Sequence, residues 1–113
     1  MPKTRVILEL GSGNDLHGSD YTKAALRAVQ DAMHHSSLSF VRSLKNDKTK
    51  LDVEVTIGVQ RPEQVDLEKI KNSSPVGNIT VKAVKGGLDV DDPENRDPAV
   101  IASAAIAVRI EMA

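Results

Sequence analysis

The run Val100-Ile-Ala-Ser-Ala-Ala-Ile-Ala-Val-Arg-Ile-Glu-Met112 constrains the architecture more than any other part of this chain. Apolar side chains stand at both its even and its odd positions, so it predicts a long final strand with two apolar faces. The face that carries Ile101, Ala105 and Ala107 has small side chains that permit close approach. An uncovered apolar sheet face is rare in monomers. We therefore expect this face to meet a second copy of the chain.

Periodicity in the rest of the chain predicts three further strands and two helices. Alternating apolar and polar residues over Leu51–Val59 indicate a half-buried strand. Apolar residues at helical spacing from Tyr21 to about His35 indicate an amphipathic helix. The remaining elements are a strand over Thr4–Leu10 that ends at Gly11-Ser12-Gly13, a short helix that starts at Pro62 and has Val65, Leu67 and Ile70 as its apolar positions, and a strand over Ile79–Ala83.

These elements give the order β-α-β-α-β-β in an α+β protein, with a single mixed β-sheet and two helices on one face. Residues 1–113 form one domain, because 113 residues is an ordinary size for a single domain. The acidic segment from Asp89 to Asp97 lacks a glycine in its middle and contains Pro93. We interpret this segment as a solvated excursion between strands and not as a calcium loop.

Composition argues against several functional classes. The 15 basic and 16 acidic residues give a net charge of -1, which argues against a protein held on nucleic acid by bulk electrostatics. No apolar run approaches the roughly 20 residues of a membrane helix, and the first residues form no signal-peptide pattern. The chain has no cysteine, so it has neither disulfides nor thiolate metal sites, and this fits a cytoplasmic location. With one Tyr, one Phe and no Trp, the core must consist of small aliphatic side chains.

The segment Gly11–Lys23 gathers glycines, carboxylates, a histidine, hydroxyls and a lysine between the first strand and the first helix. One use of such a segment is to bind an anion, with backbone N–H groups and the amino end of the helix directed at it. Two cations four residues apart form a like-charge pair that a negative group would relieve. Alternatively, the second cation pairs with Asp31 one turn further on. The ligand-binding candidates are Gly11, Ser12, Gly13, Lys23 and Arg27.

A second use of this segment is metal binding or acid–base catalysis. Asp15 and His17 lie two positions apart, so their side chains lean the same way in an extended segment, and they suit Zn²⁺, Mn²⁺ or Fe²⁺. A catalytic zinc needs about three protein ligands, so Glu9, Asp20 or a neighbouring subunit would have to complete a divalent metal site. As catalytic acid–base candidates we name Asp15, His17 and Asp20. Alternatively, Asp15 caps the turn and His17 bonds a backbone carbonyl.

The run from Asp15 to Ala32 resembles the signature of a small family of conserved hypothetical proteins known only by a locus tag. The resemblance covers nearly the whole chain, including Val53–Ile57 and Val84–Leu88. That family has no assigned activity. The resemblance therefore implies an architecture and not a function.

Gly11-Ser-Gly-Asn-Asp-Leu-His17 is similar to the Gly-x-Gly-x-Asp-x-His opening of 2-C-methyl-D-erythritol 2,4-cyclodiphosphate synthase. In that enzyme the Asp and the His bind a divalent metal, and the active sites lie between the subunits of a trimer. The resemblance implies metal-binding roles for Asp15 and His17. Arg27 stands where the enzyme has its third ligand, a histidine, so the synthase activity is not implied. The element order is similar to that of the trimeric chorismate mutase fold.

The patterns and the resemblances lead to two hypotheses of different classes. The first is a homotrimer whose inter-subunit clefts, lined by Gly11–Lys23, bind a small polar or anionic metabolite, either with or without a metal-assisted or acid–base reaction. The second is a non-catalytic structural or regulatory module, in which the same segment caps the helix and fixes an interface. Neither hypothesis involves nucleic acid or a membrane.

Overall fold

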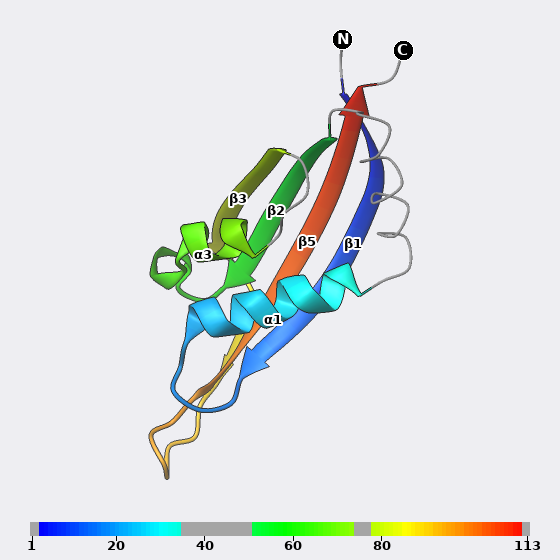
Figure 1. Cartoon of the computed structure of the whole chain (residues 1–113). Helices are drawn as coiled ribbons and strands as arrows, with labels where there is room; N and C mark the ends of the chain where they lie inside the picture. The colour runs from blue at the N-terminus through cyan, green and yellow to red at the C-terminus, as the bar shows by residue number, and fades with distance from the viewer. Residues whose placement is uncertain (1–2, 35–50, 74–77, 112–113) are drawn as a thin grey trace.

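The computed structural model describes residues 3–34, 51–73 and 78–111. This part of the chain forms a mixed α+β protein with one open sheet (Figure 1). Its elements are β1 (Lys3–Asp15), α1 (Tyr21–Met33), β2 (Leu51–Val59), η1 (Pro62–Gln64), α3 (Leu67–Asn72), β3 (Asn78–Lys85), β4 (Leu88–Val90) and β5 (Ala99–Glu111). Among the described helices, none is both long enough and apolar enough to cross a membrane.

The sheet has five strands in the order β1-β5-β2-β3, with β4 also paired to β5. β5 runs antiparallel to β1 on one side and to β2 on the other, while β2 and β3 are parallel. The strand with two apolar faces therefore lies inside the sheet, and the predicted mixed sheet is confirmed. The predicted order β-α-β-α-β-β is wrong by one strand, because β4 forms between β3 and β5.

β4 takes the place of β2 beside β5. β2 pairs with β5 as far as Gly58, opposite Ser103, and β4 follows with Leu88 opposite Ile101. The chain crosses from β3 to this place at Gly87, where φ is +63° and an added Cβ would stand 2.2 Å from the carbonyl oxygen of Ile101. This crossing requires a glycine. The acidic segment therefore begins with a strand, which the interpretation as a solvated excursion missed.

The other predicted strands and the first helix form close to their expected bounds. The strands predicted over Leu51–Val59, Ile79–Ala83 and Val100–Met112 correspond to β2, β3 and β5. Helix α1 begins at Tyr21 as predicted and ends at Met33, with the next residue as its C-cap. His35, where the prediction ended, and Met112 lie outside the described residues.

The second predicted helix divides into two pieces. Pro62 opens the single turn η1, and α3 begins at Leu67 after the cap residue Asp66, whose carboxylate accepts the N–H of Lys69. Of the expected apolar stripe, the valine and the isoleucine are buried, but Leu67 is 40% exposed. The prediction of one continuous helix is wrong because the aspartate starts a second capped helix within it.

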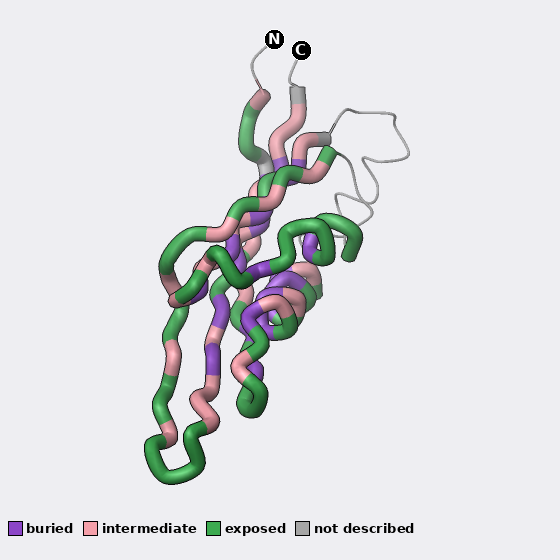
Figure 2. The backbone as a smooth tube through the Cα atoms, turned by 90° about the vertical axis from the view of Figure 1, so that its left-hand side faces the viewer, coloured by how far each residue is buried: buried purple, intermediate pink, exposed green. Residues whose placement is uncertain are grey.

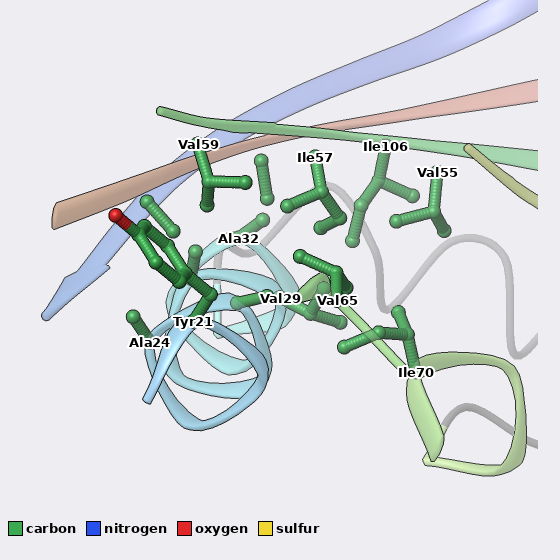
Figure 3. Packing of buried hydrophobic residues seen from close by; sticks show 14 of the residues in the cluster. Tyr21, Ala24, Val29, Ala32, Val55, Ile57, Val59, Val65, Ile70 and Ile106 are labelled. Atoms are coloured by element: carbon green, nitrogen blue, oxygen red, sulfur yellow. The ribbon is translucent and has the colours of Figure 1, made fainter. Parts of the chain in front are cut away.

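Both helices pack on one face of the sheet, as predicted (Figure 2). Burial alternates along β2 and β5, so every second side chain of these strands enters the core. Figure 3 shows Val29 of α1 and Ile70 of α3 facing the branched side chains of β2. The buried cluster is aliphatic apart from one tyrosine: Ile7, Tyr21, Ala24, Ala25, Ala28, Val29, Ala32, Val53, Val55, Ile57, Val59, Val65, Ile70, Val100, Ala102, Ala104, Ile106 and Val108.

β1 continues through the glycines that we expected to end it. A Cβ on Gly11 would stand 2.4 Å from the amide nitrogen of Ala32, and a Cβ on Gly13 would stand 2.3 Å from that of Ala28. The backbone of α1 therefore lies directly on the backbone of β1, in space that no side chain could share. The expected end of the strand at Gly11-Ser12-Gly13 is wrong, because β1 reaches Asp15 and its glycines form the contact surface for the helix.

The opposite face of the sheet is covered by none of the described residues (Figure 2). We call it the open face. Five large apolar side chains on it are at least 44% exposed: Leu8, Leu10, Val84, Leu88 and Val90. The molecule is elongated, with extents of 57 × 24 × 19 Å, and its radius of gyration of 15.3 Å exceeds the value of about 13 Å for a compact chain of this length. Self-association through the open face stays a prediction.

We expect Gly13→Ala to destabilise the protein by about 1–3 kcal/mol, because the new methyl group would overlap the backbone of α1 at Ala24 and Ala28. Urea denaturation measures this free energy of unfolding. Gly58→Ala, also in a strand, is the matched control, since its Cβ would meet nothing closer than 3.5 Å. Equal losses of stability in the two variants would show that the close helix–strand contact is not what limits position 13.

Candidate functional site

Asp15, at the end of β1, is a buried carboxylate surrounded by donors from the start of α1. Its residue is 3% exposed. One carboxylate oxygen accepts the backbone N–H of Asp20 at 2.9 Å, and the other lies 3.6 Å from Nζ of Lys23 and 3.8 Å from the guanidinium of Arg27. Arg27 also donates to the backbone carbonyl of Asn14 at 2.7 Å. A carboxylate tolerates burial only with such partners, so Asp15 fixes the end of β1 to the first turns of the helix.

Lys23 and Arg27 are the like-charge pair that the sequence analysis expected to hold an anion. The negative group between them is the carboxylate of Asp15, which belongs to the same chain. Asp31, the alternative partner of the arginine, instead accepts the backbone N–H of Ser12 at 2.9 Å. Both cationic side chains are about half exposed, at 52% and 49%, so they also present positive charge to solvent.

The glycines of the expected anion-binding loop lie within the sheet. Because the N–H of Ser12 points outward from the edge strand to Asp31, the alternation of an antiparallel ladder turns the N–H groups of Gly11 and Gly13 toward β5. These backbone donors are therefore directed at the neighbouring strand. The structure gives the two glycines a packing role against α1.

Asp20 and His17 each have a structural partner. The Asp20 side chain is the N-cap of α1 and accepts the N–H of Lys23 at 3.0 Å. The side chain of His17 is 86% exposed, and its Nδ1 lies 2.8 Å from a carboxylate oxygen of Asp97, whose other oxygen accepts the N–H of Gly18 at 3.0 Å. The Gly18 N–H and then the imidazole hold the pKa of the Asp97 carboxyl below its usual range.

The structure therefore separates the residues that were expected to act together. Asp15 faces the cations of α1, while His17 faces the loop before β5. Within residues 3–34, 51–73 and 78–111, no three His, Asp or Glu side chains are grouped so that they could hold a metal ion. The contact to Asp97 lies 80 positions away in the chain, beyond what local spacing can indicate.

Sequence reasoning missed a contact between Tyr21 and Asp89. The phenol hydroxyl donates a short hydrogen bond to one carboxylate oxygen of Asp89, and the other oxygen is buried without a hydrogen-bond partner. Burial, and secondly this hydrogen bond to a carboxylate, raise the pKa of Tyr21 to about 12. Figure 3 shows the hydroxyl at one end of the buried cluster, directed away from it. The signal available in the sequence was a lone tyrosine in an aromatic-poor chain.

A hollow of about 670 Å³ lies on the open face, and its volume is typical of small-molecule sites. Three hydroxyl side chains line it, namely Ser12, Thr56 and Ser103. Lys85 of β3 and Asp31 of α1 also belong to the lining, and glycines, alanines and two larger apolar residues complete it. Two residues of the predicted ligand-binding segment, at positions 11 and 12, therefore lie at its border.

Comparison with known proteins places the chain in a family without an assigned function. The chain belongs to the conserved hypothetical protein family Lin0512_fam, whose model matches residues 5–108. It is similar to a crystal structure from Nostoc punctiforme, described as an FtsZ-like protein of unknown function, with 35% sequence identity, a TM-score of 0.82 and 99% of each chain covered. None of the curated proteins matches the chain significantly. The resemblance to a family of conserved hypothetical proteins is thus confirmed, and the two enzyme resemblances stay predictions.

Ultraviolet absorbance of the phenolate should report Tyr21 alone, because the chain has one tyrosine and no tryptophan. We expect a titration midpoint at about 12 in the folded protein, against about 10 in denaturant. Since the folded-state pKa is raised, the stability gained from the neutral phenol is complete below about pH 10 and is lost as the pH rises through about 12. Asp89→Asn should lower the midpoint. A folded midpoint near the denatured one would refute the Tyr21–Asp89 contact.

We expect Asp15→Asn to lower the free energy of unfolding by about 1–3 kcal/mol, because Lys23 and Arg27 lose their negative partner and a buried acceptor is replaced. Urea denaturation is the measurement. Glu68→Gln, at an exposed carboxylate of α3, is the control and should change little. An Asp15→Asn variant as stable as this control would show that the carboxylate has no structural role.

Proposed function

We propose that this chain is one subunit of a homo-oligomer that binds a small anionic metabolite in the hollow on the open face, in a cleft that a neighbouring subunit completes. The observation that carries the proposal is the hollow itself, in which three hydroxyl residues lie on a mainly apolar surface and Lys85 is part of the lining. A few convergent polar groups on a mainly apolar surface are characteristic of small-molecule sites.

Lys85 supports the anionic character of the ligand. It is the last residue of the edge strand β3, and it makes no ion pair with the other described residues. An ammonium without an internal partner attracts a carboxylate or a phosphate. The turn at Gly86 and Gly87 lies beside it and lets a ligand approach the backbone closely.

The position of Asp31 restricts where the charged end of the ligand can lie. Asp31 is at the β1 edge of the hollow and Lys85 is at the β3 edge. Three strand spacings separate these edges, which is about 14 Å. The anionic group therefore belongs at the Lys85 side, and an apolar or hydroxylated portion of the ligand extends over β5 toward Ser12.

The exposed apolar side chains around the hollow support its completion by a second copy. Leu10 and Val84 border it, and Leu88 lies further along the same face. A patch of this kind on a soluble protein marks an interaction surface. The resemblance to chorismate mutase-like proteins implies three subunits, and we propose a homotrimer on that ground.

A second candidate is the non-catalytic structural module. The observation that favours it is that Asp15, His17 and Asp20 all have partners within the chain. Their proposed roles as acid–base groups or metal ligands, and the cytoplasmic location, stay predictions. The two candidates differ in whether the hollow binds a ligand.

We expect phenyl phosphate to raise the melting temperature of the protein more than inorganic phosphate, because its ring adds apolar contact in the hollow. Lys85→Ala should weaken this binding roughly tenfold or more, the loss typical of a charged hydrogen bond. Thermal shift and isothermal calorimetry give the two readouts. Arg61→Ala, at an exposed arginine before η1 and outside the hollow, is the control and should bind normally.

Absence of binding by either probe to the unaltered protein would favour the structural module. Binding that Lys85→Ala leaves intact would place the ligand elsewhere in the molecule. Because Lys23 and Arg27 are the alternative cations, Lys23→Ala is the variant that would then be expected to lose it.

A further inference from the structure

The turn between β4 and β5 extends beyond the rest of the sheet and carries unpaired negative charge (Figure 1). We call Asp91 and Glu94 the acidic tip. Both are exposed, and neither makes an ion pair with another described residue. The other two carboxylates of this turn have partners, because Asp92 accepts from Asn95 and Asp97 accepts from the loop before α1.

The β3 edge of the sheet carries unpaired positive charge. Lys69 and Lys71 lie in the last turn of α3, and Lys82 lies on β3, the edge strand that α3 packs against. We call these three lysines the basic edge. All three are exposed, and none has an ion-pair partner among the described residues. Lys82 stands opposite Thr56, a residue of the hollow, and so lies on the open face.

The acidic tip makes no ion pair with the basic edge of its own chain and extends away from it (Figure 1). β4 is paired with β5 and directs the tip away from the end of β3. Two complementary charged surfaces that lie apart within one molecule can meet between two copies.

We infer that the acidic tip of one copy docks on the basic edge of the next, in a head-to-tail contact beside the hollow. This inference rests on the proposed function, for which it names the segment of the neighbour that completes the cleft. Leu88 and Val90, which lead to the tip, are 55% and 47% exposed on the open face and supply apolar contact to the same neighbour. A heterologous contact of this kind closes into a ring when its rotation permits.

Light scattering and sedimentation velocity over a concentration series test the contact. The unaltered chain should exceed the 12.2 kDa mass of one subunit. Two double variants reverse one surface each: Asp91→Lys with Glu94→Lys, and Lys71→Glu with Lys82→Glu. Each double variant should raise the dissociation constant tenfold or more, since like charges then face each other. The quadruple variant, which combines all four substitutions and so reverses both surfaces, should regain assembly. Added salt should weaken assembly of the unaltered chain.

Two further variants separate failure of this inference from failure of the proposed function. Leu10→Glu places a charge on the apolar open face and should dissociate any assembly that uses this face. Gln30→Lys adds an exposed charge on α1, outside the two surfaces, and should leave assembly unchanged. Circular dichroism establishes that each variant is folded.

Assembly that Leu10→Glu abolishes, but that reversal of the tip or of the edge leaves unchanged, would overturn the docking contact and leave the proposed oligomer standing. Failure of the quadruple variant to regain assembly would likewise overturn the pairing of the acidic tip with the basic edge. A monomeric unaltered chain would overturn the docking contact and the proposed oligomer together, while phosphate binding at Lys85 would still be measurable by itself.

Discussion

The close approach of α1 to β1 is the constraint on which the rest of the structure depends. The backbone of the helix lies on Gly11 and Gly13, at distances that exclude even a methyl group. Alanines at positions 24, 28 and 32 supply the complementary surface on the helix, so two backbones pack with almost no side chain between them. An aromatic-poor chain can build a dense core in this way. Small residues gain contacts because their backbones come close together, whereas large residues gain contacts through the size of their side chains.

The close contact between α1 and β1 also determines which partners the nearby polar residues have. With the helix held on the edge strand, Asp31 lies within reach of the Ser12 N–H, and the first turns of α1 surround Asp15. The buried carboxylate and its cations are thus a consequence of packing. The sequence presents the same residues as a dense functional-looking segment, and the structure shows why density alone is a weak indicator: a tight strand–helix connection needs caps and counter-charges for its own backbone.

Much of the fold could be predicted from periodicity, and the failures have definite physical causes. Leu51–Val59 and the helix from Tyr21 are long and regular, so their side-chain period alone identifies them. Gly11-Ser12-Gly13 follows the strand period too, but its inward residues have no side chains, and their role exists only once α1 is placed on them. Leu88–Val90 is too short to show a period at all, and it becomes a strand through pairing with β5.

The candidate site was less predictable because its contacts are not local. The sequence indicates that Lys23 and Arg27 require a negative group, yet it cannot show that Asp15 bends back to provide one. The partner of His17 is further away still, across the turn before β5. Local spacing tells which chemical groups are present, and the tertiary path of the chain decides which of them meet.

The two faces of the sheet differ in how much of their apolar surface this chain buries. On the helix side, Asp15 and Asp20 find partners within the chain, and apolar side chains are buried. On the open face, leucines and valines stay exposed, and Lys82 makes no ion pair with another described residue. Exposed apolar area is costly for an isolated molecule and is relieved by contact with another protein surface, while an exposed ammonium is hydrated and stays available to an anion or an acidic group. These features are the reason that we place the proposed ligand and the proposed neighbouring copy on the open face.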